Sequence, residues 1–211
     1  MSESLLTLLD WRRRLNDLYA EVRRLRRGDP QAAHAHWQEV RNELFARHPQ
    51  TPLTPEARAA FTALPVWPYD PAYAFCARVQ TDLPTEQFVV QTSAGHDMPL
   101  TRVGRVALRN EHHDLGTLDA YWIAVYGGGL FVPFRDGGSG RSSYGGGRYL
   151  LDTVKSADLG NSPGGELLLD FNFAYHPSCY YDPQWSCPLA PPQNHLNAEV
   201  RAGERSAEQH A

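Results

Sequence analysis

Apolar residues at helical spacing dominate the first part of the chain. Within residues 2–27 the apolar positions alternate steps of three and four, at Leu8, Trp11, Leu15, Leu18, Val22 and Leu25. This spacing predicts an amphipathic helix, which Gly28 is placed to end because glycine accepts the left-handed conformation. Asp29 as N-cap and Pro30 at the first helical position then predict a second helix that runs to about Arg47.

The pattern changes at Pro65, after a short third helix that Thr54 and Pro55 begin and that we expect to end near Leu64. Short runs rich in β-branched and aromatic residues follow, separated by glycine, proline, asparagine and aspartate. The predicted strands are residues 73–79, 87–92, 100–108, 118–126, 130–134, 148–151, 167–171 and 196–200. We therefore predict an α+β, mainly β, fold in which N-terminal helices pack on an antiparallel β barrel or sandwich.

The same change divides the chain into three parts. Residues 1–64 form an N-terminal helical segment, residues 65–203 a β-rich domain, and residues 204–211 a polar tail. We expect the chain to fray from Ala202 onward. The first helix carries many arginines, which indicate either a solvated face or a helix–helix contact, and a homodimer through this helix stays open.

Composition and charge exclude several classes of function. The chain has 211 residues, of which 42% are hydrophobic, and a formal net charge of −4. It can therefore build a core, and it is too acidic for a general nucleic-acid binder. No apolar run approaches the roughly 20 residues that span a bilayer, and the first residues do not resemble a secretory signal. We expect a cytoplasmic protein with no nucleic-acid partner, no membrane partner and no cofactor.

Glycines and arginines are concentrated in residues 131–150. Apolar residues bracket this stretch, which argues against a linker or an RNA-binding tail, and its glycine spacing lacks the Lys-Ser/Thr of a Walker loop. A pocket wall fits better, because Arg135 and Arg148 offer forked donors for a carboxylate or phosphate, and Tyr144 offers a flat side. The alternative is a structural ion pair, with Asp136 as the partner of one arginine.

A second dense run, residues 169–196, begins as a strand and becomes a loop rich in proline and aromatic residues. Together the two runs resemble the bacterial and archaeal family of domain of unknown function 1684. The motifs of that family are Phe-x-Pro-Phe-Arg-Asp, Ser-Gly, Tyr-x-x-Gly-Arg-Tyr-Leu, Asp-Phe-Asn-x-Ala-Tyr-x-Pro-x-Cys, Cys-Pro-Leu-x-Pro-Pro-x-Asn and Ala-Gly-Glu. They fall on residues 131–136, 139–140, 144–150, 170–179, 187–194 and 202–204. The resemblance covers the chain from about Leu53 and implies no assigned activity.

Two histidines and two cysteines in the second run form an H-x2-C-x7-C-x7-H pattern, at His176, Cys179, Cys187 and His195. Such a set could bind tetrahedral zinc. The spacing is not that of a standard zinc finger, however, and the family usually has Asn in place of His176 and often Arg in place of His195, so we predict no metal. The alternatives are a disulfide between Cys179 and Cys187, two buried free thiols, or Cys179 as a nucleophile with His176 nearby.

We predict that the two runs meet on one side of the β-rich domain and form one pocket for a small anionic molecule. The expected ligand-binding residues are Arg135, Tyr144, Arg148, Asn172, Tyr175 and Asn194. The sequence leaves open whether the protein is an enzyme; the candidates for hydrolysis or acid/base chemistry are Asp136 and Asp170, with Cys179 as a third catalytic candidate. The competing interpretations are a structural or interaction protein whose motifs form a buried stabilising network, and a zinc-binding domain.

Overall fold

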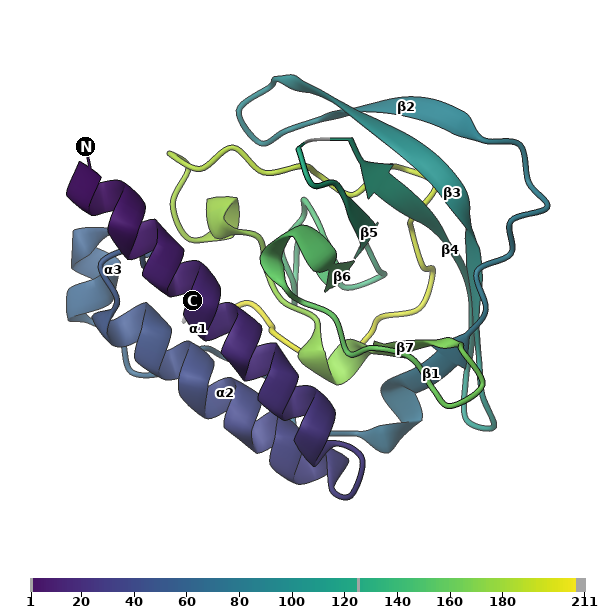
Figure 1. The fold of residues 1–211 in the computed structure, drawn as a ribbon, viewed down its shortest axis with the longest axis horizontal. Coiled ribbons are helices and arrows are strands. Elements are labelled where there is room, and N and C mark those ends of the chain that lie inside the picture. The colour runs from purple at the N-terminus through teal and green to yellow at the C-terminus, as the bar shows by residue number, and fades with distance from the viewer. Residues whose placement is uncertain (1, 125, 208–211) are drawn as a thin grey trace.

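A helical hairpin packs across an antiparallel sheet in the computed structural model, which describes residues 2–124 and 126–207 (Figure 1). The two long helices run antiparallel on one flank of the molecule and cover one face of the sheet (Figure 1). No helix within the described ranges is both long and apolar enough to cross a membrane. The helices are α1 (Ser2–Leu25), α2 (Pro30–Arg47) and α3 (Pro55–Ala59).

The turn between α1 and α2 follows from local hydrogen bonding. The N–H groups of Gly28 and Asp29 both donate to the carbonyl of Leu25, so α1 ends two residues earlier than predicted. Gly28 does not adopt the predicted left-handed conformation, because this tight turn does not require it. The Asp29 carboxylate accepts from the Ala32 N–H at 2.9 Å, which confirms the predicted N-cap of α2.

The third helix is shorter than the sequence predicts. Its N-cap is confirmed, since the Thr54 hydroxyl accepts from the Ala57 N–H at 3.1 Å. It ends at Ala59 instead of near Leu64, because the chain then turns toward α2. There the Leu64 N–H donates to the side-chain oxygen of Asn42 at 2.8 Å, an interaction that no local pattern reveals.

The described part of the chain forms seven strands in two antiparallel sheets, which confirms the predicted α+β class. The larger sheet is an open sheet with the strand order β2-β3-β4-β5-β6, not a closed barrel, and the smaller sheet pairs β1 with β7. One residue of the predicted strand 118–126, Val125, lies outside the described residues. The strands are β1 (Ala74–Ala77), β2 (Glu86–Gln91), β3 (Asp97–Arg109), β4 (Asp114–Ile123), β5 (Gly129–Phe134), β6 (Arg148–Asp152) and β7 (Leu167–Asp170).

The sheet is covered on both faces where β5 and β6 lie. Phe131 and Tyr149 pack into the core shared with the helical hairpin, whereas Val132 and Leu150, the next residues along each strand, pack with β1, β7 and the C-terminal segment. This alternation is the two-residue period of a β-strand. Because both faces are covered, β6 is buried along its whole length.

The predicted strand at residues 196–200 is wrong. The segment is irregular. Leu196 and Ala198 bond to the backbone of residues 135 and 137, whereas Val200 bonds to buried side chains. The Val200 carbonyl accepts from Arg148 Nη2 at 2.8 Å, and its N–H donates to Asp136 Oδ2 at 3.2 Å. Buried backbone groups need partners, and here these two charged side chains replace a ladder.

The end of the β-rich domain is also more ordered than a frayed tail. Ala202 and Glu204 are 0% exposed, although the sequence places them at the start of a polar end. The Glu204 carboxylate accepts hydrogen bonds from the Arg41 guanidinium of α2, through Nε at 3.0 Å and also through Nη2. This buried ion pair joins the helical hairpin to the C-terminal segment. Residues 208–211 of the predicted tail lie outside the described residues.

Glu204→Gln is expected to lower the free energy of unfolding by about 3–5 kcal/mol, because it leaves the buried Arg41 charge uncompensated. Urea unfolding monitored by circular dichroism measures the change. Glu21→Gln is the matched control, since it removes the same charge from an exposed ion pair with Arg24. It should cost far less, because surface pairs contribute little. Equal losses in the two variants would contradict the importance of the buried pair.

His34 of α2 is a second buried polar side chain, and it titrates abnormally. Its ring packs against those of Trp37, Tyr69 and Phe173 at centroid distances of 5.5–5.7 Å. Burial lowers the pKa of His34 to about 4, against a smaller opposing effect of a hydrogen bond with the backbone of Asn172. The unfolded chain, with a pKa near 6.5, therefore binds a proton that the folded protein rejects.

The contribution of neutral His34 to the free energy of unfolding is expected to be fully present above about pH 6.5. It should be lost as the pH decreases from about 6.5 to about 4, which lowers the free energy of unfolding by about 2–3 kcal/mol. The buried His176 has a pKa shifted in the same direction and adds to this loss. Urea unfolding at pH 7.5 and pH 4.5 should show a smaller difference for His34→Gln than for the wild type. The exposed His96 provides the control His96→Gln, which should keep the wild-type difference. An unchanged difference in His34→Gln contradicts the assignment.

Candidate functional site

The glycine-rich loop and the proline-rich segment lie against each other, as the sequence predicts. The Tyr144 N–H donates to His176 Nε2 at 3.2 Å, and the rings of Tyr144 and Tyr180 are 5.6 Å apart. Gly147 makes part of this approach possible. Its φ is +98°, and an added Cβ would lie 2.5 Å from the carbonyl oxygen of Phe134, so no other residue fits without strain.

Arg148 lies in the protein interior and is 1% exposed. Its Nη1 donates to the carbonyls of Ala202 at 2.5 Å and Glu204 at 2.9 Å. Its Nη2 donates to the carbonyl of Val200 at 2.8 Å and to Asp136 Oδ2 at 2.6 Å. Burial lowers the pKa of Arg148, and the Asp136 carboxylate opposes this effect. All four terminal N–H groups of this predicted ligand-binding residue are therefore bonded to the protein itself.

The two predicted asparagines are also bonded internally. The side chain of Asn194 accepts from the Asp119 N–H and donates to the Asp119 carbonyl, both at 2.9 Å. The side chain of Asn172 accepts from the Asp70 N–H at 2.9 Å and donates to the Asp70 carbonyl at 2.8 Å. It also donates to Asp170 Oδ1 at 2.8 Å. Each asparagine thus bridges two segments that are distant in sequence, in the manner of a backbone pairing.

The other predicted residues of the glycine-rich loop are more accessible. Arg135 is half-buried, and its backbone pairs with His195. Tyr144 lines an open groove together with Trp67, Arg141 and other residues of the same loop. The structure therefore places these predicted residues in one region of the molecule, but not in one pocket with the two asparagines.

The two candidate catalytic carboxylates are buried in ionic contacts. Asp136 bonds to Arg148, as described, and Asp170 Oδ2 lies 3.3 Å from Arg26 Nη2 of the turn after α1. Burial raises the pKa of Asp170, while Asn172 and Arg26 lower it. Both carboxylates are enclosed by the protein and lie outside the cavity described next.

A cavity of about 420 Å³ lies between the helical hairpin and the segment that follows β7. Its volume is in the range of small-molecule sites. Of the six predicted ligand-binding residues, Tyr175 lines it. Its wall includes Trp11, Arg12, Tyr19, Arg41, Lys155, Tyr175, His176, Tyr181, Trp185 and Cys187.

Sequence reasoning missed the cationic residues of this cavity, which are Arg12, Arg41 and Lys155. Arg12 belongs to a helix whose many arginines resemble a solvated face, and Arg41 is followed by two polar residues of α2, so no local signal distinguishes either of them. Lys155 carries a signal that could have been used, because it is the single lysine in a chain that otherwise uses arginine.

Arg41 supplies a fixed positive charge to the cavity wall. Burial alone would lower its pKa, but the Glu204 carboxylate together with Tyr181 and Tyr19 outweighs burial and raises the pKa above its usual value. The guanidinium carbon also lies 5.0–5.2 Å from the ring centroids of Trp37, Phe45 and Tyr175, within the range of cation–π attraction. Its Nη1 forms no hydrogen bond with any described residue, so one donor of this cation is unused.

His176 adds an unused donor to the same wall. Its Nε2 accepts the Tyr144 N–H, and burial together with the charges of Arg148 and Arg41 holds its pKa well below the usual range. The ring is therefore neutral, and its proton is assigned to Nδ1. Nδ1 is buried, lies 3.7 Å from Glu204 Oε2, and has no hydrogen-bond partner in the part of the chain that the structure describes.

Tyr19 and Trp185 extend the set of donors. The Tyr19 hydroxyl accepts from Trp37 Nε1 at 3.2 Å, which leaves its own proton available, and burial raises its pKa to about 12. Nε1 of Trp185 is buried without a partner among the described residues. Both carboxylate oxygens of Glu204, in contrast, already accept hydrogen bonds, from Arg41, from the backbone N–H of His176 and from the Tyr181 hydroxyl.

Cys187 of this wall and Cys179, eight residues earlier in the chain, are free thiols. Cys179 and Cys187 are both buried, and no disulfide joins them. Cys179 Sγ donates to the Tyr144 hydroxyl at 3.9 Å. Interactions with Cys187, Ser93 and Tyr144 lower the pKa of Cys179 to about 6, against the opposing effect of burial. The interaction with Cys179, together with burial, raises the pKa of Cys187. His176, which the sequence suggested as the base of Cys179, instead accepts the Tyr144 N–H through Nε2.

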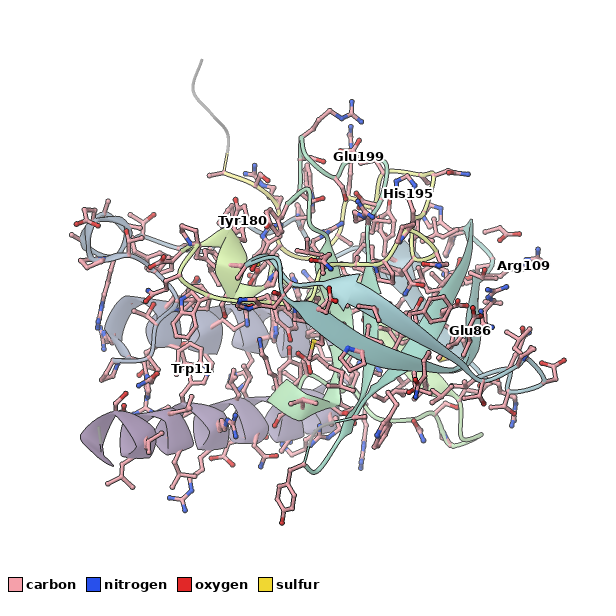
Figure 2. The ribbon with its side chains drawn as sticks, turned by 90° about the horizontal axis from the view of Figure 1, so that it is seen from above. Trp11, Glu86, Arg109, Tyr180, His195 and Glu199 are labelled. Carbon is pink, nitrogen blue, oxygen red and sulfur yellow. The ribbon has the colours of Figure 1, made fainter. Side chains whose placement is uncertain are left out.

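The zinc-binding alternative is not supported by the geometry. His195 is exposed beside Glu199 on the C-terminal segment, far from Trp11 of α1 and the cavity that Trp11 lines (Figure 2). Cys179 and Cys187 are buried on the cavity side of the domain. No three His, Cys, Asp or Glu side chains within the described ranges are grouped to hold a metal ion.

Comparison with known proteins gives a family without an assigned activity. A solution NMR structure of an uncharacterized protein from Haloarcula marismortui has 34% sequence identity and a TM-score of 0.58, and the match covers 82% of this chain and 92% of that chain. No curated protein matches the chain. The family model for a protein of unknown function, DUF1684, matches residues 59–205, which include both motif runs but neither α1 nor α2. The chain is therefore a member of the DUF1684 family.

Proposed function

We propose that the protein binds a small anionic molecule, with a carboxylate or phosphate group, in the cavity between the helical hairpin and the segment after β7. One observation carries the proposal: the wall holds buried hydrogen-bond donors that have no partner among the described residues. Nδ1 of His176 and Nε1 of Trp185 are buried donors with no partner among the described residues, while the acceptor oxygens of Glu204 are all in use. Arg41 Nη1 adds a cationic donor that bonds to no described residue. An anion supplies the missing acceptors and relieves the cost of buried unpaired donors.

The positive charges and the aromatic side chains of the cavity wall indicate what kind of anion would fit. Arg12 and Lys155 add two cations to the charge of Arg41. Trp11 and Tyr175 offer flat apolar surfaces that suit a planar body. We therefore propose an aromatic or otherwise flat molecule that carries one anionic group. Hydrolysis or acid/base catalysis by Asp136 or Asp170 stays a prediction, and the cavity offers no support for it.

A structural role for the motif residues is a second proposal, and it is compatible with the first. The bonds of Arg148, Asn172 and Asn194 favour a buried network that holds distant segments together. Homodimer formation through the first helix and cytoplasmic location stay predictions. The exposure of Leu5 at 67% and Leu6 at 66% on α1 favours the dimer, because large exposed apolar side chains often mark contacts.

Lys155 allows a direct test of ligand binding, because it is the single lysine of the chain. Phenyl phosphate or benzoate is expected to slow its reaction with an amine-reactive ester severalfold relative to the N-terminal amine, which is the internal control. Peptide mass spectrometry measures both rates. Benzamide, the neutral analogue of benzoate, should give no protection. Equal protection by benzoate and benzamide argues against an anion site.

Arg12→Gln is expected to weaken phenyl phosphate binding roughly two- to fivefold at low salt, since a charge at the rim of a site contributes about 0.5–1 kcal/mol. Titration followed by NMR or calorimetry measures the dissociation constant. Arg13→Gln is the matched control, because Arg13 is the neighbouring exposed arginine and does not line the cavity. The difference between the two variants should shrink at high salt. A larger effect of Arg13→Gln places the anion elsewhere.

A further inference from the structure

The cavity of the proposed anion site is elongated along α1. Leu8, Trp11, Leu15 and Tyr19, which follow one another at steps of three and four residues on one face of this helix, all line it. An α-helix rises about 1.5 Å per residue, so the lined stretch is about 16 Å long. The segment after β7, yellow-green in Figure 1, passes beside the N-terminal half of α1 and contributes another wall. A cavity of this shape suits a long ligand better than a compact one.

The groups best suited to an anion lie at one end of this stretch, near Tyr19. The Tyr19 hydroxyl accepts from Trp37 Nε1 at 3.2 Å, and the ring centroid of Trp37 lies 5.0 Å from the guanidinium carbon of Arg41. The Glu204 carboxylate joins Arg41 to the backbone N–H of His176. Nδ1 of His176 is buried without a partner among the described residues. A fixed positive charge and an unused neutral donor are therefore neighbours at this end.

The described wall at the opposite end, near Leu8, is neutral apart from the exposed Arg12. Gln50 marks this end, because its Nε2 donates to the hydroxyl of Thr7 on α1 at 2.8 Å. Trp185 Nε1 is a buried neutral donor of the same wall, which can meet an ether or carbonyl oxygen but cannot balance a second negative charge. A ligand that fills the whole cavity should therefore carry its charge at the Tyr19 end and an uncharged body toward Leu8.

A second hollow adjoins the neutral end of the cavity. It has a volume of about 700 Å³ and lies beside α3; Gln50 and Trp185 line both this hollow and the cavity. We call it the exit groove, and its apolar side chains include Pro49, Leu53 and Pro55.

The charge of the exit groove is directed away from a ligand. Its arginine, Arg58, donates through Nε to the Ala46 carbonyl at 2.9 Å and through Nη2 to the Arg47 carbonyl at 2.6 Å, at the C-terminal end of α2. A cation there compensates the negative end of the helix dipole. The exit groove therefore accepts an apolar chain more readily than a second anion.

We propose that the ligand of the cavity is a linear amphiphile. Its anionic group binds at Arg41 and His176, and its apolar chain follows α1 and passes between Gln50 and Trp185 into the exit groove. The inference rests on the proposed function, because the same cavity binds the anionic group, and it adds the kind of body that this group carries. A flat ring near the anion, continued by an alkyl chain on the opposite side, satisfies both the aromatic wall and the length of the cavity.

Calorimetric titration of the full chain with benzoate, 4-butylbenzoate and 4-octylbenzoate tests the proposed chain. The dissociation constant should fall at least tenfold from benzoate to 4-butylbenzoate, since full burial of one CH₂ group lowers it roughly fourfold. It should fall again for 4-octylbenzoate. The isomer 2-butylbenzoate has a similar apolar area but directs its chain across the cavity, so it should bind no more tightly than benzoate. Neutral 4-butylbenzamide should bind at least tenfold more weakly than 4-butylbenzoate.

Equal affinities of the 2-butyl and 4-butyl isomers, or of the benzoate and the benzamide, overturn the linear amphiphile. Binding of phenyl phosphate and benzoate with no gain from the 4-butyl chain overturns this inference and leaves the proposed function standing. Absence of binding for every anion tested overturns the proposed function as well.

Ala59→Trp tests the exit groove separately. Ala59 is an exposed residue of α3 that lines the groove, so an indole at this position fills the space for the end of the chain. It should weaken 4-octylbenzoate binding at least threefold and leave phenyl phosphate binding unchanged, which also shows that the variant is folded. Ala57→Trp is the matched control, because Ala57 is an exposed alanine of the same helix that does not line the groove. Equal effects of the two substitutions on 4-octylbenzoate overturn the assigned exit.

Discussion

The buried ion pair between Arg41 and Glu204 connects the parts of this structure that the sequence separates. Arg41 comes from the helical hairpin, and Glu204 comes from the C-terminal end of the family motif. The same carboxylate also accepts from the backbone N–H of His176 and from the Tyr181 hydroxyl. A buried pair is often no more stabilising than apolar residues of the same volume, because both charges lose their hydration. Its physical effect here is to fix where the helices sit on the sheet and to leave an unused cationic donor at a cavity.

Arg148 is a second buried guanidinium, and it binds backbone carbonyl groups of the C-terminal segment. Three carbonyl groups in the segment from Val200 to Glu204 point toward one guanidinium, which supplies the N–H groups that a neighbouring strand would otherwise provide. Asp136 neutralises the charge and orients the guanidinium. This arrangement explains why a segment with strand-like composition is irregular and yet buried. It also positions Glu204, so the motif network and the cavity are physically linked.

Two regions of the chain form the cavity wall, and the family model matches only one of them. Tyr175, His176 and Cys187 belong to the region that the family model matches, whereas Arg12 and Arg41 lie on helices outside it. The cavity and its unused donors are therefore properties of the assembled chain. Both regions supply aromatic side chains, such as Trp11 of α1 and Tyr175, and the helical hairpin supplies two of the three cations.

Local chemistry let the sequence alone determine much of the fold. The N-caps at Asp29 and Thr54, most strands and the meeting of the two motif runs were predictable, because capping and strand periodicity depend on residues close in sequence. Tertiary structure alone decided which arginines lose their water, that Val200 pairs with the side chains of Arg148 and Asp136, and where the cavity opens. Desolvation of a charge depends on atoms brought together from distant segments, and no pattern within one helix distinguishes Arg41 from its solvated neighbours.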